Sequence, residues 1–242
     1  MRIRLINPNT TASMTETIGR AAREAAAAGT EIDAVTSPTG PVSIVGYYDE
    51  ALSLPGLLIE IRKGEALGVA GHVIACFDDT GLDAARQIAA APVVGIGEAA
   101  CHAATLIAHR FTVITTLSRS IPAIEHNVHK YGFERRAKVR AADVPVLALE
   151  DETSDARARI DAEIARALEE DRAEAIVLGC AGMAKLARAL SARHGCPVID
   201  GVGAAVKLVE MLAALGLKTS KRSGYDPGAL KPLTGPISHL MR

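Results

Sequence analysis

The sequence predicts an α/β fold of two similar halves, each a mostly parallel sheet flanked by helices, with the halves related by a pseudo-two-fold axis. Short apolar runs alternate with longer amphipathic segments along the chain, which is typical of strand–helix layers. With 242 residues, 49% of them hydrophobic, the chain can bury a large core. Short motifs also recur in the same order in the two halves. We expect the active site in the cleft between them.

The apolar runs indicate strands that are buried on both faces. They are rich in Val and Ile and are bounded by Gly, Asn, Pro or Thr, as in parallel sheets. They span residues 3–6, 32–35, 73–76, 93–96, 111–115, 175–180 and 198–199. The clearest helical pattern runs over residues 154–171, where Ile160, Ile164 and Leu168 recur every four residues. Ser154 is the predicted N-cap of that helix.

An internal repeat supports the two halves. Residues 92–100 (PVVGIGEAA) are matched by residues 197–205 (PVIDGVGAA), 105 positions later. Residues 73–76 (VIAC) match residues 177–180 (VLGC), and residues 5–7 (LIN) match residues 113–115 (VIT) at similar offsets. Any α/β chain supplies some Pro-Val-Ile strand starts, but three ordered matches favour a duplicated unit. We place the first half at residues 1–97 plus 206–242 and the second at residues 98–205.

Each half carries one cysteine at the end of a predicted strand, Cys76 in the first and Cys180 in the second. Open α/β sheets bind ligands at the carboxyl ends of their strands, so the two thiols are expected to share a cleft. Inverting a carbon centre needs a base on one face and an acid on the other, and two thiols of matched pKa suit both roles. A helix N-terminus after each strand is expected to favour the thiolate. Cys101 and Cys196 are interpreted as inert small hydrophobes.

Several function classes are excluded by composition. A net charge of −1, three Phe, four Tyr and no Trp do not suit nucleic-acid binding. No stretch approaches ~18 consecutive apolar residues, and no signal peptide is evident, so we expect a cytoplasmic protein without a membrane span. Gly97 and Gly203 lie in G-x-G patterns that do not continue as a nucleotide fingerprint. The histidines and cysteines lack metal-ligand spacing, so no metal is expected.

Six segments resemble a known family, the aspartate/glutamate/hydantoin racemase superfamily, and within it the hydantoin and allantoin racemases. They are residues 5–10 (LINPNT), 40–46, 74–82 (IACFDDTGL), 95–99 (GIGEA), 113–117 (VITTL) and 178–183 (LGCAGM), so the resemblance covers essentially the whole chain. It implies catalysis by Cys76 and Cys180 without a cofactor. It also implies that the substrate-binding residues are Asn7, Asn9, Ile44, Phe77, Asp78, Thr115, Thr116, Ala181 and Gly182.

The loops after the cysteines indicate which substrate class the resemblance favours. Amino-acid racemases of this type carry Asn-Thr after the first cysteine, whereas this chain has Phe77 there and Ala181 after the second. These neighbours suit a neutral hydantoin-like ring with one substituent at C5, allantoin being a further candidate. Many members read Phe-Gly-Asp-Pro-Gly after the first cysteine, but this chain reads FDDTG at residues 77–81, which leaves the substituent preference open.

Three alternatives remain at the level of sequence. One is an amino-acid racemase of the aspartate/glutamate type. Another is a related maleate isomerase or malonate decarboxylase. A third is a non-catalytic binding protein that kept the two-half fold. In each case the expected partner is a small molecule, and the Ala-rich helices favour a homo-oligomer.

Overall fold

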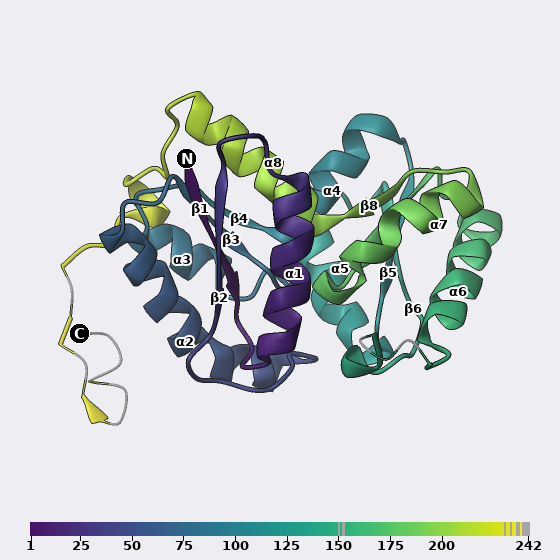
Figure 1. Cartoon of the computed structure of the whole chain (residues 1–242), viewed down its shortest axis with the longest axis horizontal. Helices are drawn as coiled ribbons and strands as arrows, with labels where there is room; N and C mark the ends of the chain where they lie inside the picture. Colours follow the sequence, from purple (N-terminus) through teal and green to yellow (C-terminus); the bar gives the residue numbers. More distant parts are fainter. Residues whose placement is uncertain (150, 152, 230, 233, 236–237, 239–242) are drawn as a thin grey trace.

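Two four-stranded sheets lie side by side in the chain, each flanked by helices (Figure 1). They are seen in a computed structural model that describes residues 1–149, 151, 153–229, 231–232, 234–235 and 238. The first sheet contains β1 (Arg2–Asn7), β2 (Glu31–Thr36), β3 (Gly71–Ile74) and β4 (Val93–Gly95). The second contains β5 (Phe111–Thr115), β6 (Ala137–Ala141), β7 (Ala175–Gly179) and β8 (Val198–Asp200).

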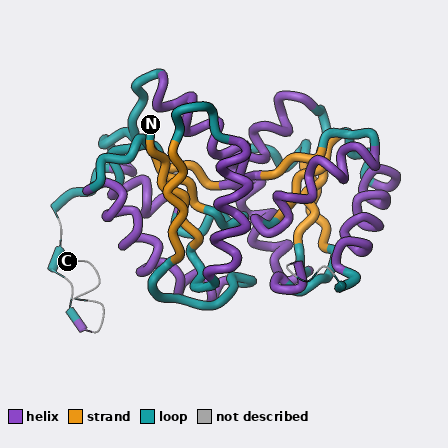
Figure 2. Tube along the Cα trace, in the orientation of Figure 1, coloured by secondary structure: helices purple, strands orange, loops and turns teal. Residues whose placement is uncertain are grey.

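Helical segments connect most successive strands, as parallel pairing requires (Figure 2). The α-helices are α1 (Ala12–Ala25), α2 (Tyr47–Ala66), α3 (Leu82–Ile88), α4 (Ile96–Ile107), α5 (Ile121–Lys130), α6 (Ala156–Glu170), α7 (Ala187–His194) and α8 (Gly201–Ala214). Short 3₁₀ turns are η1 (Ser118–Ser120), η2 (Val146–Leu149), η3 (Ala181–Leu186) and η4 (Ser223–Tyr225).

The two sheets have the same topology, which confirms the predicted pair of similar α/β halves. The strand order is β2-β1-β3-β4 in one and β6-β5-β7-β8 in the other, and every neighbouring pair is parallel. The sequence repeat falls on equivalent elements. Val93 and Val198 begin the last strand of each sheet, and Ile96 and Gly201 begin the helices that follow. The placement of the division at residues 97 and 205 stays a prediction.

All seven predicted strands are present, and β6 is the one that the pattern missed. Its five residues include Lys138 and Arg140 between small or β-branched residues, and its side chains are mostly half-exposed. β6 lies at the edge of its sheet, where charged side chains are tolerated because one backbone edge faces away from the other strands. The apolar-run criterion therefore failed at an edge strand.

The predicted helix over residues 154–171 is α6, but its predicted N-cap is wrong. Asp155 is the N-cap residue, and its side chain makes no capping hydrogen bond. The Ser154 hydroxyl instead donates to the backbone carbonyls of Ala148 and Asp151, both at 2.8 Å. The Ser154 side chain therefore stabilises the turn that precedes the helix and does not cap the helix itself.

Helices α1, α4 and α8 pack between the two sheets and join the halves into one body (Figure 1). One apolar cluster contains Ile3 and Leu5 of the first sheet together with Phe111 and Val113 of the second. Further clusters lie on the outer face of each sheet. Because one core is shared, the facing carboxyl ends of the sheets are held at a fixed separation.

The segment after α8 returns to the first half. The backbone N–H of Thr219 donates to the carbonyl of Ala90 at 3.1 Å, and the Tyr225 hydroxyl donates to the Asp83 carboxylate at 2.9 Å. Residues 230, 233, 236–237 and 239–242 of the predicted first half lie outside the described residues. In the described part of the chain, no helix is long and apolar enough to cross a membrane.

Candidate active site

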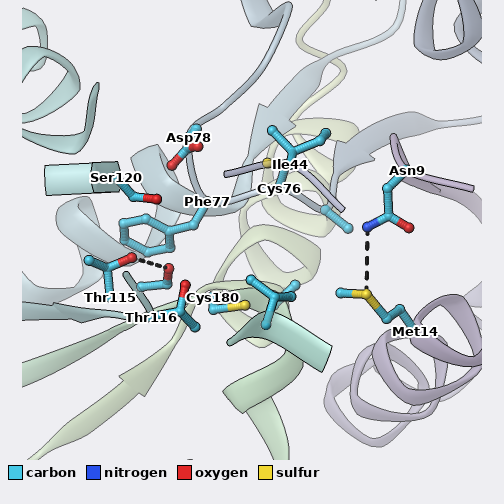
Figure 3. Close-up of a pocket in the computed structure, with 14 residues that line it drawn as sticks. Asn9, Met14, Ile44, Cys76, Phe77, Asp78, Thr115, Thr116, Ser120 and Cys180 are labelled. Atoms are coloured by element: carbon cyan, nitrogen blue, oxygen red, sulfur yellow. Dashed lines mark hydrogen bonds between the residues drawn. The ribbon is translucent and has the colours of Figure 1, made fainter. Parts of the chain in front are cut away.

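A cavity of about 450 Å³, including its open mouth, lies where the carboxyl ends of the two sheets face each other (Figure 3). The loops after β1, β3, β5 and β7 all contribute to it, so both halves supply matching segments. The residues that line it are Asn9, Met14, Ile44, Ala75, Cys76, Phe77, Asp78, Thr115, Thr116, Ser120, Val146, Gly179, Cys180 and Ala181. The cavity thus occupies the expected cleft between the halves.

Cys76 and Cys180 both line this cavity as free thiols and lie on opposite sides of it in Figure 3. Cys180 follows directly after β7, whereas Cys76 lies two residues beyond the end of β3. The pairing of β3 with β1 continues through Ala75, whose N–H donates to the carbonyl of Ile6 at 2.8 Å. Both cysteines are therefore positioned by the last backbone pairings of a buried strand.

The surroundings of the two sulfur atoms repeat the symmetry of the fold. The backbone N–H of Asp78 donates to the Cys76 sulfur, and that of Gly182 donates to the Cys180 sulfur, two residues further along in each case. The Thr80 hydroxyl adds a hydrogen bond to Cys76 at 3.6 Å. Donors of this kind stabilise a thiolate, so each half offers one sulfur and one backbone N–H to the cavity.

Burial nevertheless keeps both cysteines protonated in the unliganded protein. It raises the pKa of Cys180 to about 11, and the Asp78 carboxylate adds to the increase. The pKa of Cys76 lies well above its usual value for the same two reasons. The predicted helix N-terminus is found at Cys180, which is the N-cap residue of the 3₁₀ turn η3, but not at Cys76, because α3 begins only at Leu82. Desolvation therefore outweighs the local donors.

Asp78 is the one carboxyl group among the residues that line the cavity. Burial raises its pKa to about 7, and the neighbouring carboxylates of Glu50 and Asp79 contribute. Its backbone carbonyl accepts a hydrogen bond of 2.7 Å from the amide of Asn127 in α5. A contact from the second half thus holds the loop that carries Cys76 and Asp78.

Asp79 anchors the same loop without lining the cavity. It has a left-handed backbone (φ 51°), and its carboxylate accepts hydrogen bonds from the N–H groups of Gly97 at 2.9 Å and Glu98 at 2.6 Å. These groups belong to the first turn of α4, which favours a negative charge. The Tyr131 hydroxyl donates a third hydrogen bond at 2.6 Å. Asp79 therefore caps α4 rather than the next helix along the chain.

Most predicted substrate-binding residues line the cavity, namely Asn9, Ile44, Phe77, Asp78, Thr115, Thr116 and Ala181. Asn7 and Gly182 are not among the lining residues. The buried amide of Asn7 donates to the side chain of Asn9 at 2.9 Å, so it supports a lining residue from behind. Gly182 acts through its N–H on Cys180. Their roles in substrate binding, like those of the lining residues, stay predictions.

The structure adds five lining residues that the sequence did not single out: Met14, Ala75, Ser120, Val146 and Gly179. Ala75 and Gly179 directly precede the cysteines, and that adjacency was a usable signal. Met14 lies on the buried face of α1, where it is indistinguishable by sequence from a core residue. Ser120 and Val146 lie in 3₁₀ turns after β5 and β6, and no local pattern marks them.

The cavity wall does not favour an anionic molecule. Among the described residues that line it there is no Lys, Arg or His. The polar groups come from Asn9, Thr115, Thr116 and Ser120, and the Asn9 amide contacts the Met14 sulfur at 3.6 Å (Figure 3). The described residues also contain no cluster of three or more His, Cys, Asp or Glu side chains that could hold a metal ion.

Known proteins match the chain along nearly its whole length. The family model described as Asp/Glu/Hydantoin racemase matches residues 3–209. A hydantoin racemase of Rhizobium meliloti is 52% identical over 236 residues, which cover 97% of this chain and 98% of that protein. A hydantoin racemase of Pseudomonas sp. (strain NS671) is 46% identical over 243 residues, covering 100% of this chain and 98% of that protein.

A solved structure shows the same fold. The allantoin racemase from Klebsiella pneumoniae superimposes with a TM-score of 0.96 and is 52% identical, covering 99% of this chain and 98% of that one. The match covers both sheets, so the arrangement of two similar halves is also that of the solved relative.

Proposed function

This chain belongs to the Asp/Glu/hydantoin racemase family and is an isomerase of the racemase class, and we propose that it inverts C5 of 5-monosubstituted hydantoins, allantoin included. In this proposal Cys76 and Cys180 transfer the proton, and no cofactor takes part. The observation that carries the proposal is the pair of free thiols on opposite sides of one cavity. Each sulfur faces the space from a different half.

The choice of a neutral ring rests on the charge of the cavity wall. A free amino acid presents a carboxylate that needs a cationic or multidentate partner, and the lining residues supply a carboxyl group, Asp78, instead. The hydroxyl groups of Thr115 and Thr116 and the amide of Asn9 suit the carbonyl and N–H groups of a hydantoin. The relatives at 46% and 52% identity are named hydantoin racemases, and the solved relative is named an allantoin racemase.

The proposed reaction is a two-base proton transfer. One cysteine, as the thiolate, takes the C5 proton of one enantiomer, and the C–H electron pair moves toward the adjacent ring carbonyl as an enolate. The other cysteine, as the thiol, delivers its proton to the opposite face of C5. The two sulfur atoms have then exchanged protonation states, and the opposite enantiomer uses them in reverse. Because the carbonyl and the ring spread the negative charge, the chemistry needs no cofactor as an electron sink.

The raised pKa values of both thiols determine the resting state of this cycle. At neutral pH the unliganded protein holds two protonated cysteines, so one proton must leave before the first turnover. The N–H donors of Asp78 and Gly182 stabilise whichever sulfur becomes the thiolate. They are equally placed in the two halves, which suits a base and an acid that exchange roles.

The test is single substitution of each cysteine. Cys76→Ser and Cys180→Ser should each lower racemisation by about 10³-fold or more, since a positioned acid or base contributes roughly 10²–10⁴. In D₂O, each variant should exchange the C5 proton of only one enantiomer, and the two variants should act on opposite enantiomers. Cys196→Ser, which changes a half-buried thiol away from the cavity, should leave the rate unchanged. Full racemisation by either of the first two variants contradicts the mechanism.

Racemisation of aspartate or glutamate and isomerisation or decarboxylation of dicarboxylic acids are the competing activities. Each acts on an anionic substrate, and no lining residue is a cation. Polarimetry of hydantoins, allantoin, aspartate and glutamate, with maleate and arylmalonate assayed separately, distinguishes them. Turnover of the amino acids but not of the hydantoins would overturn the proposal. A purely binding role is set aside because the chain is a racemase.

We also propose that the enzyme is a cytoplasmic homo-oligomer. All four cysteines are free thiols, as a reducing compartment favours. Leu106 and Ile107 at the end of α4 are 84% and 60% exposed, and apolar side chains of this size are often covered by a partner. Sedimentation equilibrium of the purified protein measures the stoichiometry, and a monomer at micromolar concentration would overturn this part.

A further inference from the structure

The end of the cavity near Asp78 carries negative charge from two elements. Asp78 follows β3 and lines the cavity, and Glu50 lies in the first turn of α2. The Oε1 atom of Glu50 is buried and has no hydrogen-bond partner among the described residues. Burial raises the pKa of Glu50, and Glu50 in turn raises the pKa of Asp78. The two carboxyl groups therefore lie close enough to interact in a poorly solvated place.

The position of Asp78 is fixed by its surroundings. Asn127 holds its backbone carbonyl, and the next residue, Asp79, is tied to α4 and to Tyr131. The backbone of Asp78 is therefore held in place on both sides. Asp78 is half-buried, and its pKa of about 7 has the loss of solvent as its first cause.

Three cations on the helices α2, α3 and α5 are paired with carboxylates other than Asp78 and Glu50. Lys130 of α5 binds Asp83 at 2.6 Å, and Arg86 of α3 binds Glu98 of α4. Lys63 lies in the last turn of α2, away from Glu50, and binds Glu60 at 2.7 Å. Among the described residues no cation forms an ion pair with Asp78 or Glu50, and none is a cause of the pKa shift of either group, so a cationic ligand group would meet an unbalanced charge there.

We propose that Asp78, reinforced by Glu50, is a specificity-determining residue that favours hydantoins whose 5-substituent is cationic or ends in N–H donors and disfavours those whose 5-substituent carries a carboxylate. This inference rests on the proposed hydantoin racemase activity and refines it. An alkylammonium or a ureido group donates hydrogen bonds that a carboxylate accepts. A carboxylate substituent instead meets a like charge in a space of low dielectric, where repulsion is strong.

The side chain of Asp78 gives this end of the cavity both bulk and a negative charge, because it is the one carboxyl group among the residues that line the cavity. The preference for one 5-substituent over another is therefore the property most directly changed by this residue.

The experiment compares two pairs of nearly isosteric substrates by polarimetry at pH 8, where Asp78 is mostly ionised. One pair is 5-(2-carboxyethyl)hydantoin and its neutral 5-(2-carbamoylethyl) analogue. The other is 5-(4-aminobutyl)hydantoin and neutral 5-pentylhydantoin. In the unaltered enzyme, kcat/KM should favour the carbamoyl compound over the carboxylate, and the ammonium over the alkyl compound, each by about tenfold or more.

Asp78→Asn keeps the size of the side chain and removes its charge, so both ratios should move toward one, mainly through KM. Glu50→Gln should move them in the same direction by less. Glu125→Gln, which removes an exposed charge of α5 that does not line the cavity, should leave them as in the unaltered enzyme. Ratios unchanged in Asp78→Asn overturn the inference.

The controls separate this inference from the proposed function. If the neutral hydantoins are racemised but the charged ones are not discriminated, the inference fails and the proposed function stands. If no hydantoin is racemised, the proposed function fails. Should Asp78→Asn be inactive, calorimetric Kd values for the same four compounds give the same ratios, and equal ratios in variant and unaltered protein again overturn the inference.

Discussion

The hydroxyl of Tyr131 donates a hydrogen bond to the carboxylate of Asp79 at 2.6 Å, and this bond crosses from one half of the molecule to the other. Tyr131 directly follows α5 of the second half, and Asp79 lies in the loop after β3 of the first. Asp79 is adjacent to Asp78, which lines the cavity. The bond therefore ties the Cys76 loop to the half that carries Cys180.

Tyr131→Phe should weaken both stability and turnover, because it removes one of three donors to a buried carboxylate. At pH 8, above the pKa of about 7 that burial gives Asp79, a hydrogen bond to the charged group is worth about 2 kcal/mol. Urea unfolding should show a loss of this size, and kcat should fall severalfold with little change in KM. Tyr225→Phe, which removes an exposed bond to Asp83, is the control and should stay within about 0.5 kcal/mol. Equal losses of unfolding free energy in Tyr131→Phe and Tyr225→Phe would contradict a stabilising role of the bond between Tyr131 and Asp79.

The racemisation rate should rise with pH across the neutral range. The base must be a thiolate, and burial raises the pKa of Cys180 to about 11 and of Cys76 well above its usual value. Above about pH 8 Asp78 is already ionised and no longer changes the pKa of the thiols, so the thiolate fraction of the free enzyme grows in proportion to hydroxide there and log(kcat/KM) should increase with a slope near one. A flat profile would mean that one cysteine is already ionised at rest.

Asp78→Asn should shift that profile toward lower pH. The Asp78 carboxylate is among the causes that raise the pKa of both thiols, so removing its charge lowers both pKa values. The rate of alkylation of Cys76 and Cys180 by iodoacetamide reports the thiolate fraction without requiring turnover. At pH 8 it should be greater in the variant than in the unaltered protein. Slower alkylation in the variant would show that Asp78 acts on the thiols in the opposite sense.

Folding stability should decrease as the pH rises from about 4 to about 7. The pKa of Asp78 is about 7 in the folded protein against 3.8 in a free chain, so in this window the folded state binds more protons than the unfolded state. The stabilising effect of its proton is complete below pH 4 and is lost as the pH passes 7. Asp78→Asn should reduce this slope in urea titrations, and the part that remains comes from Asp79, whose pKa is also raised to about 7. Asp83→Asn should not change it, because the pKa of Asp83 is lowered and its contribution is lost only in more acidic solution.

The strands, the two-half repeat and the two cysteines were predictable because each leaves a local signal. Buried parallel strands appear as apolar runs, and the repeat aligns the β3 and β7 ends at which Cys76 and Cys180 lie. The hydrogen bond from Tyr131 that holds the Cys76 loop was not predictable. Tyr131 and Asp79 are 52 residues apart, and no periodicity relates them. The raised pKa values of the thiols likewise depend on burial by loops that meet only in the folded chain.

The G-x-G pattern that ends at Gly97 has no nucleotide-binding role in the sequence analysis, and the structure gives its second glycine a packing role that can be tested. A Cβ atom at this position would lie 2.2 Å from the carbonyl oxygen of Phe77 and 2.8 Å from the Asp79 carboxylate. Gly97→Ala must therefore displace the loop that carries Cys76, since a backbone carbonyl cannot move aside alone. Overpacking of this kind costs about 1–3 kcal/mol, and kcat should fall because the Cys76 sulfur moves relative to Cys180. Gly224→Ala, where a Cβ meets no atom within 4 Å, is the matched control for urea unfolding and polarimetry. If Gly97→Ala keeps full racemisation with unchanged stability, the close approach of α4 to the Cys76 loop does not position the thiol.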